Sequence, residues 1–288
     1  EKFAHLKVNK GELDRNAWYH RMAHHTINPL QEESLSLVKS MIDQYMPHFD
    51  SEWFNICCDE TFDLQSYGEQ GMDEGKIYVD FVKKIADYVK QKGKKVMMWA
   101  DILLQHPEVI SLLPEETMFL NWYYNPIPDQ MTEKVSRFAQ SGRKQIVCPG
   151  TSSWNRFIEE IDRSEGNITN LVDYGAKWGA MGILNTNWGD FGHIAPWNCN
   201  LYGMIVGAEK GWNADGVLTP EFEQAASSLL YDSDEINVID IIRTMGRCER
   251  TCDWMLFMYW YSANTKEGRK TELECDMDKA IAHIAKLD

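Results

Sequence analysis

Five short apolar runs, each followed by turn residues and then a helical pattern, constrain the fold of this chain more than any other feature. Each run is almost continuously apolar, which is typical of a strand in a parallel sheet that is covered on both faces. Between the first two runs, Ile77, Phe81, Ile85 and Val89 recur every four residues and Gly93 follows, which predicts an amphipathic helix with a stop. The runs occupy residues 53–60, 95–102, 117–124, 145–152 and 181–188.

Helical patterns separate the strands and then dominate the end of the chain. Alternation of strands and helices predicts the α/β class. Residues 1–30 read as irregular loop, and beyond about Gly216 no further strand is expected. Further helices are predicted over residues 35–45, around 135–138 and 171–175, and over 220–231, 236–261 and 272–286.

The position of polar and aromatic residues within the runs decides between α/β architectures. They collect where each run ends, and a (β/α)8 barrel draws its active site from the carboxyl ends of several strands. No G-x-G-x-x-G or P-loop motif suggests a nucleotide-binding fold. The sequence therefore predicts an incomplete TIM barrel with five visible strands in residues 1–215, followed by a helical segment in residues 216–288.

Charge and composition narrow the class of partner. With 44 Asp and Glu against 29 Lys and Arg, the net charge of −15 disfavours nucleic acid and acidic membrane surfaces. No apolar run approaches the roughly 20 residues that span a bilayer. The 11 Trp residues suit a sugar-binding cleft, although many are expected in the core. The oligomeric state is not indicated.

The seven cysteines form no C-x-x-C pair and no zinc-site spacing. We therefore expect no metal and no cofactor, and an odd number of cysteines favours a reducing, cytoplasmic compartment. The first residue is Glu1 rather than Met, so the sequence says little about export.

The acidic pair Asp59-Glu60 is the strongest candidate for chemistry. Other acidic pairs in the chain read as solvated helix faces or turns, but this one directly follows the apolar run W-F-N-I-C-C. Burying two carboxylates there costs several kcal/mol of desolvation, and such a cost is expected only where the carboxylates have a function. Close carboxylates also raise one another's pKa, which keeps one protonated as a general acid.

These residues carry a resemblance to a known family. F-N-I-C-C-D-E, the W-x-D of Trp99 and Asp101, the Trp122 strand and the W-x-D of Trp188 and Asp190 resemble glycoside hydrolase family 20, in that order. This family comprises the β-N-acetylhexosaminidases, and residues 26–60 and 183–193 are similar in particular to bacterial N-acetylglucosaminidases. The resemblance covers about residues 25–215.

The resemblance implies a retaining, substrate-assisted mechanism in which the 2-acetamido oxygen of the sugar attacks the anomeric carbon. Glu60 is then the general acid and later the base, and Asp59 orients the acetamido group. Asp190 is expected to hold the outer hydroxyls of a terminal N-acetylglucosamine or N-acetylgalactosamine. The expected walls of the sugar pocket are Trp99, Trp122 and Trp188.

The chain departs from the family pattern at several positions. Asn55, Cys57 and Cys58 stand where the family has His and two Gly, and the cysteines fit only if the backbone is ordinary there. The acetamido-binding Tyr is missing from its strand, and Tyr124 or Trp154 are the candidates to replace it. Asn125 and His193 lie in binding loops, where a loop-capping role is as well supported.

The first three barrel strands of the family have no counterpart, so the chain resembles a barrel that is truncated at its N-terminus. On its own it is then expected to self-associate and to hydrolyse little. Two alternatives stay open: a carbohydrate-binding barrel without turnover, and another barrel glycosidase that uses Asp59 or Asp101 as a true nucleophile.

Overall fold

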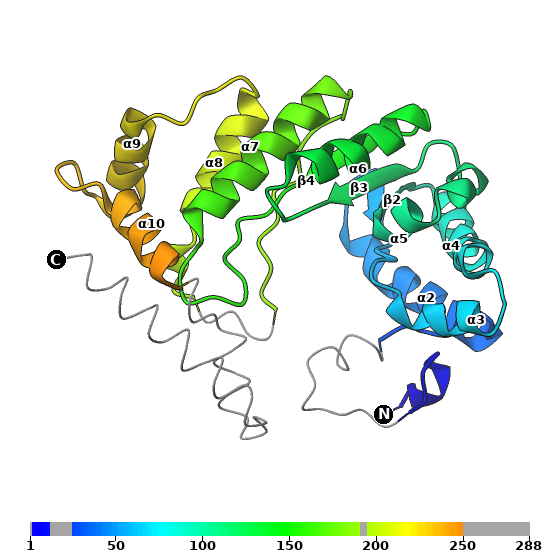
Figure 1. Ribbon diagram of the computed structural model, residues 1–288. Coiled ribbons are helices and arrows are strands. Elements are labelled where there is room, and N and C mark those ends of the chain that lie inside the picture. The colour runs from blue at the N-terminus through cyan, green and yellow to red at the C-terminus, as the bar shows by residue number, and fades with distance from the viewer. Residues whose placement is uncertain (1, 12–24, 191–194, 250–288) are drawn as a thin grey trace. The chain divides into compact units, whose positions relative to one another are not determined.

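A computed structural model describes residues 2–11, 25–190 and 195–249 (Figure 1). The chain divides into two compact units. The first comprises Glu1–Trp122 and Lys134–Ile146, and the second comprises Tyr123–Glu133 and Val147–Asp288. The division that the sequence predicts, into a barrel segment in residues 1–215 and a helical segment in residues 216–288, stays a prediction.

The first unit is built on parallel strands in sequence order. β1 (Trp53–Asn55) pairs with β2 (Lys95–Trp99), which pairs with β3 (Met118–Trp122), with Phe54 opposite Val96 and Met98 opposite Phe119. β4 (Gln145–Cys148) completes the order β1-β2-β3-β4, and its first two residues belong to this unit. The predicted parallel α/β sheet is confirmed.

The strands are shorter than the apolar runs that predicted them. β1 ends at Asn55, although its run continues to Glu60. Residues beyond the last ladder hydrogen bond keep their apolar character because they enter the core from a loop: Ile56 and Cys58 pack against the buried cluster that contains Met98 and Phe119. An apolar run therefore marks a strand together with the loop at its carboxyl end.

Helix α4 (Glu74–Gln91) covers the sheet of the first unit. Asp73 caps its N-terminus, with Oδ1 accepting a hydrogen bond of 2.8 Å from the Lys76 amide, and Gly93 beyond its end has a φ of 84°. Val82 belongs to the cluster that contains Met98, while Ile85 packs with Val96 and with helix α2 (Glu32–Tyr45). The helix predicted from the four-residue repeat is confirmed.

The fifth predicted strand is present only as isolated bridges in the second unit. Val147 bridges Ile183 and Gly150 bridges Thr186, both in parallel orientation. The Leu184 amide donates to the Val147 carbonyl at 3.0 Å, and the Thr186 amide donates to the Pro149 carbonyl at 2.8 Å. The segment therefore lies in the expected place beside β4, but its ladder is interrupted.

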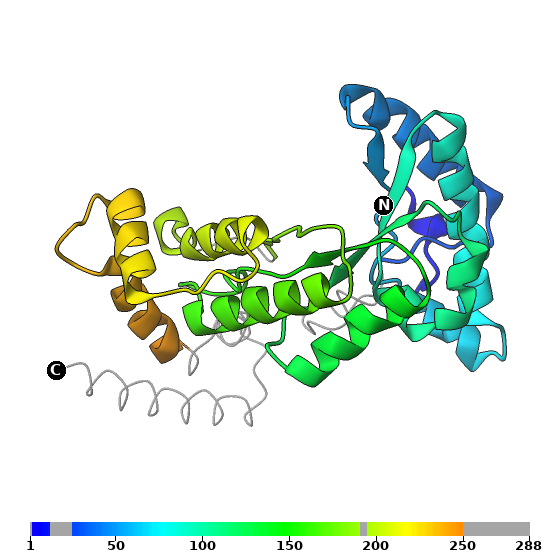
Figure 2. The same cartoon turned by 90° about the horizontal axis from the view of Figure 1, so that it is seen from above.

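Helices make up the rest of the second unit. α7 (Ile161–Lys177) and α8 (Tyr202–Trp212) lie side by side in both views (Figure 1, Figure 2), and α9 (Pro220–Tyr231) packs on α10 (Val238–Glu249). The predicted helix over residues 220–231 is confirmed, and that over 236–261 begins at Val238. Its continuation beyond residue 249 and the helix predicted over 272–286 lie outside the described residues. The shared core contains Ile161, Ile168, Val172, Tyr202, Val206, Ala226, Ile239 and Ile242.

Shorter elements connect these parts. Upstream of β1, the described residues form α2, two short 3-10 turns and an isolated antiparallel bridge between Lys7 and Ile27. Among the described residues, no helix combines the length and the apolar character that crossing a bilayer requires. The remaining elements are η1 (Ala4–Leu6), η2 (Met46–His48), η3 (Phe62–Leu64), α3 (Gln65–Glu69), α5 (Asp101–Gln105), η4 (Pro107–Leu112), α6 (Pro128–Gln140) and η5 (Trp197–Cys199).

Candidate active site

The loop that carries the acidic pair has an unusual backbone. Cys57, Cys58 and Glu60 have φ values of 60°, 66° and 49°, in the left-handed region that non-glycine residues rarely occupy. The condition under which the cysteines could replace glycines, an ordinary backbone, is therefore not met. They adopt the left-handed conformation at a cost of order 1–3 kcal/mol each. Strain of this kind collects at functional sites.

Hydrogen bonds from neighbouring elements fix this loop. The Trp99 amide at the end of β2 donates to the Cys57 carbonyl at 3.0 Å, and the Tyr78 hydroxyl on α4 donates to the Cys58 carbonyl at 2.8 Å. Asn55 Oδ1 accepts a hydrogen bond of 2.9 Å from the Cys57 amide. Asn55, which stands where the family has His, thus serves here as an acceptor that turns the chain out of β1.

Asp101 joins the acidic pair. Its Oδ2 accepts a hydrogen bond of 2.9 Å from the backbone amide of Glu60. Burial raises the pKa of Asp101; the Glu60 amide lowers it, the charge of Asp59 raises it further, and the side chain of Trp122 lowers it. Burial also raises the pKa of Asp59. Three carboxyl groups thus gather at the carboxyl ends of β1 and β2.

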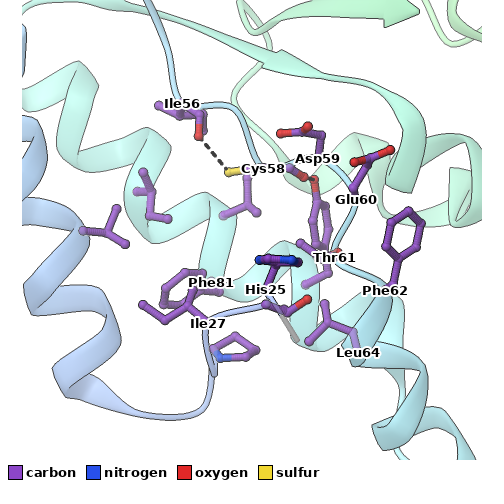
Figure 3. A pocket seen from close by; sticks show the side chains of 16 residues that line it. His25, Ile27, Ile56, Cys58, Asp59, Glu60, Thr61, Phe62, Leu64 and Phe81 are labelled. Carbon is purple, nitrogen blue, oxygen red and sulfur yellow. Dashed lines mark hydrogen bonds between the residues drawn. The ribbon is translucent and has the colours of Figure 1, made fainter. Parts of the chain in front are cut away.

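A cavity of about 430 Å3 lies beside the pair (Figure 3). Asp59 and Glu60 border it on one side, and Cys58, Leu64 and Phe81 line it with apolar groups. None of the predicted Trp residues lines this cavity. It is therefore an apolar space next to the carboxylates and not the Trp-walled sugar pocket that the sequence predicts.

The two predicted Trp residues of the first unit differ in exposure. Trp99 is 7% exposed at the end of β2, where its amide anchors the loop that carries Asp59 and Glu60. Trp122, the last residue of β3, is half-buried, and its effect on the pKa of Asp101 places it near that carboxylate. The first unit therefore brings together Asp59, Glu60 and Trp122, and adds Asp101.

The second unit brings together three of the predicted aromatic residues. Trp188 Nε1 donates a hydrogen bond of 2.7 Å to the Tyr124 hydroxyl, and the Trp154 ring meets the Tyr124 ring edge-on with centroids 4.9 Å apart. An indole can only donate, so the Tyr124 oxygen is the acceptor and its own proton points elsewhere. Tyr124 therefore has the chemistry of a hydroxyl donor held in a fixed position.

Gly150 makes this aromatic packing possible. A Cβ at this position would lie 2.6 Å from Trp154 Cη2 and 2.9 Å from Tyr124 Cδ1. The Gly150 amide donates to Asn167 Oδ1, and Asn167 Nδ2 donates to the Tyr123 carbonyl, at 2.9 and 2.7 Å. Asn167 is fully buried. Sequence reasoning missed both residues, and the only available signal was an apolar run interrupted by Pro149 and Gly150.

The other predicted binding residues are less enclosed. Asn125 is exposed, and its Oδ1 accepts a hydrogen bond of 2.6 Å from Arg163. Asp190 is also exposed, and His193 lies outside the described residues. No group of three or more His, Cys, Asp or Glu side chains among the described residues could hold a metal ion.

Comparison with known proteins decides the family. The model of the glycosyl hydrolase family 20 catalytic domain matches residues 5–171, more than half of the chain. The chain belongs to glycosyl hydrolase family 20. The stretch matched includes the Asp59-Glu60 loop, Asp101 and Trp122, so the resemblance seen in the strand-end motifs is confirmed.

Two curated relatives of this family 20 chain are called hexosaminidase D. The chain is 32% identical to the Bos taurus protein over 192 residues, covering 59% of this chain and 56% of the relative. It is 23% identical to the Homo sapiens protein, again over 192 residues, covering 59% of this chain and 40% of the relative. The chain thus spans about half the length of the curated relatives it matches.

Two solved structures show the fold. A chitobiase from Flavobacterium johnsoniae superposes with a TM-score of 0.59 at 14% identity, covering 99% of this chain and 52% of the other. A β-N-acetylhexosaminidase from Bacteroides fragilis gives 0.54 at 16% identity, covering 73% and 46%. With the family match, they identify the parallel sheet as part of a TIM barrel, and the prediction of an incomplete α/β barrel is confirmed.

Proposed function

We propose that this protein is an exo-β-N-acetylhexosaminidase, which removes terminal β-linked N-acetylglucosamine or N-acetylgalactosamine with retention of configuration. The observation that carries the proposal is the Asp59-Glu60 pair in a strained loop at the carboxyl end of a barrel strand, in a family 20 chain. Strain and buried charge are both costly, and they persist where function uses them.

Glu60 is the proposed general acid and base. It protonates the leaving oxygen as the glycosidic bond breaks, and the resulting carboxylate then takes a proton from the water that attacks the anomeric carbon. Its backbone is fixed through the hydrogen bond between the Glu60 amide and Asp101. Fixing the backbone limits the positions that the carboxyl group can reach, which favours a productive geometry.

Asp59 is the proposed partner of the 2-acetamido group. It accepts a hydrogen bond from the acetamido N–H while the carbonyl oxygen attacks the anomeric carbon and forms an oxazolinium ion. Burial raises the pKa of Asp59 in the absence of sugar, so its charge is poorly solvated. Positive charge that develops on the acetamido group compensates this cost, and the interaction is therefore stronger in the transition state than in the ground state.

Tyr124 is the proposed donor to the acetamido carbonyl, in place of the Tyr that the family carries on the next strand. Its support is the hydrogen bond from Trp188, which directs the Tyr124 proton elsewhere. Trp99, Trp122 and Trp188 are the proposed walls of the sugar pocket, and Trp154 supports the Tyr124 ring. Asp190 is proposed to bind the outer hydroxyls, which restricts the enzyme to a terminal sugar.

We also propose that the protein works in a reducing, cytoplasmic compartment. Cys57, Cys58, Cys148 and Cys199 are all free thiols. Two of them border the acidic pair, where disulfide exchange would disturb the loop. The net charge of −15 argues for a glycan partner over nucleic acid or a membrane surface.

The test compares nitrophenyl N-acetyl-β-glucosaminide with nitrophenyl β-glucoside as substrates of the full-length protein. We expect hydrolysis of the N-acetyl sugar only, strong inhibition by a thiazoline that mimics the oxazoline, and loss of turnover in Asp59→Ala. Asp50→Ala, at an exposed carboxylate, is the control. Equal hydrolysis of both sugars, or a wild-type rate in Asp59→Ala, would contradict the proposal; thiazoline binding without turnover would favour a carbohydrate-binding protein.

A further inference from the structure

Asp101 occupies a rigid position between two elements of the first unit. It is the first residue of α5, and one residue, Ala100, separates it from the end of β2 at Trp99. The preceding amide, that of Ala100, donates to the Leu120 carbonyl on β3 at 3.0 Å, and Ala100 is fully buried. The backbone that carries Asp101 is therefore fixed by the sheet.

The Asp101 side chain contacts the residue proposed as the general acid, 41 positions earlier in the sequence. Asp101 Oδ2 accepts the Glu60 amide hydrogen at 2.9 Å, and Glu60 holds a φ of 49°. A Glu in this region loses its strained conformation unless its surroundings fix it. The hydrogen bond to a charged acceptor is one of the stronger bonds available for this purpose.

The free energy needed to bury the Asp101 carboxylate is larger than a hydrogen bond that only supports the fold would require. Asp101 Oδ1 is buried and has no hydrogen-bond partner among the described residues. The neighbouring charge of Asp59 adds to the cost of ionising Asp101. A buried, half-satisfied carboxylate is expensive, and a neutral side chain could accept the same amide hydrogen.

We propose that Asp101 is a positioning residue that holds the Glu60 backbone in its left-handed conformation and thereby aims the Glu60 carboxyl group at the leaving oxygen. The inference rests on the proposed glycosidase function. It differs from the use of Asp101 as a nucleophile, because Oδ2 accepts the Glu60 amide hydrogen and Oδ1 is buried.

The experiment measures kcat/KM of the full-length protein on two N-acetyl-β-glucosaminides, one with an alkyl leaving group and one with a dinitrophenyl leaving group. A poor leaving group needs protonation in the first step and a good one does not, so a misplaced general acid slows the alkyl substrate selectively. The variants are Asp101→Ala and Asp101→Asn. The controls are the same substitutions at Asp63, a buried carboxylate that accepts the Thr26 amide at 3.1 Å.

For Asp101→Ala we expect a loss of about 10²-fold on the alkyl substrate, comparable to a misplacement of about 1 Å, and a much smaller loss on the dinitrophenyl substrate. Asp101→Asn keeps an acceptor oxygen and should recover part of the loss, because a neutral oxygen is a weaker acceptor than a carboxylate. The Asp63 variants should change kcat/KM by the same factor on both substrates. Equal losses on both substrates in Asp101→Ala, or a chain that no longer unfolds cooperatively, would assign Asp101 to folding and overturn the inference. Absence of wild-type hydrolysis would instead contradict the proposed function.

Discussion

The carboxylate loop of the first unit and the aromatic cluster of the second are held by different means. Residues 57–60 are fixed through their backbone, with three left-handed φ values, hydrogen bonds donated by Trp99 and Tyr78, and one donated to Asp101. Tyr124, Trp154 and Trp188 are instead fixed through their side chains.

Under the proposed function, the loop and the cluster have different tasks. Proton transfer needs a carboxyl group that is held within about 0.5 Å of its productive position, and a backbone that is fixed by neighbouring elements supplies such precision. A sugar face and an acetamido group need shape and one directed hydroxyl, which packed rings supply. Substitution of Glu60 in the loop should therefore slow poor leaving groups selectively, and substitutions in the cluster should impair use of the acetamido group whatever the leaving group.

The largest expected effect comes from Glu60→Gln. Loss of the general acid should lower kcat/KM on an alkyl N-acetyl-β-glucosaminide by roughly 10²–10⁴-fold, and less on a dinitrophenyl substrate. Glu52→Gln is the control, since Glu52 lies before the other end of β1 and forms a surface ion pair with Lys95 at 2.7 Å. An equal loss on both substrates would indicate a folding defect and remove the distinction between the two regions.

The next effect tests the aromatic cluster. Tyr124→Phe keeps the ring but removes the hydroxyl that Trp188 bonds, and loss of the group that orients the attacking carbonyl oxygen should lower kcat by about 10²-fold. Tyr123→Phe, a change at the buried neighbour whose hydroxyl bonds Gln130, should have little effect. Because the donor acts on the acetamido group, the loss should be similar for good and poor leaving groups. A selective loss on poor leaving groups would place Tyr124 with the acid machinery instead.

A third substitution tests whether side-chain packing holds the cluster. Gly150→Ala introduces a Cβ that overlaps Trp154 and Tyr124, so we expect a loss of about 1–3 kcal/mol in the free energy of unfolding and a higher KM. Gly182→Ala is the matched control, because nothing lies within 4 Å of its added Cβ. Urea unfolding and KM on the N-acetyl substrate provide the two readouts. Equal stability of the two variants would show that the Trp154 and Tyr124 rings can shift to make room for the added Cβ at little cost in free energy.

The smallest effect tests whether the backbone of the loop is strained. At Cys57 and at Cys58, the Gly variant should exceed the Ala variant by about 1 kcal/mol in the free energy of unfolding, because only Ala retains the steric cost of a left-handed φ. At Cys199, in η5, the order should reverse. Thermal or urea unfolding of the six variants decides the point. If the Ala variants at positions 57 and 58 are as stable as the Gly variants, the backbone of the loop is not strained.

The sequence predicted the frame of the site better than its details. Apolar runs and helical spacing located β1 to β4, α4 and α9, because burial on both faces leaves a continuous apolar pattern. The acidic pair and the strand-end Trp residues were also evident, since polar groups after a buried strand are costly. The left-handed backbone at Cys57 and Cys58 was not evident, because cysteine normally marks an ordinary buried position.

The contact between Asp101 and Glu60 could not be predicted for a different reason. It joins residues that are 41 positions apart, and only the register of β1 and β2 brings them together. Gly150 and Asn167 share this difficulty, since their roles depend on rings and carbonyl groups from other parts of the chain. The pattern of apolar residues along a sequence indicates which positions are buried and whether they lie in a helix or a strand. These contacts depend instead on how distant parts of the chain come together in the fold.

The central claim is that Asp59 and Glu60 serve a reaction in which the acetamido group of the substrate is the nucleophile. A series of aryl N-acetyl-β-glucosaminides with zero to three fluorine atoms on the acetyl methyl tests it most directly, because each fluorine withdraws electrons from the attacking carbonyl oxygen. With the full-length protein, we predict that kcat/KM falls steadily with every added fluorine and that no covalent glycosyl-enzyme can be trapped. A rate independent of fluorination, with a sugar covalently attached to Asp59 or Asp101, would contradict the account.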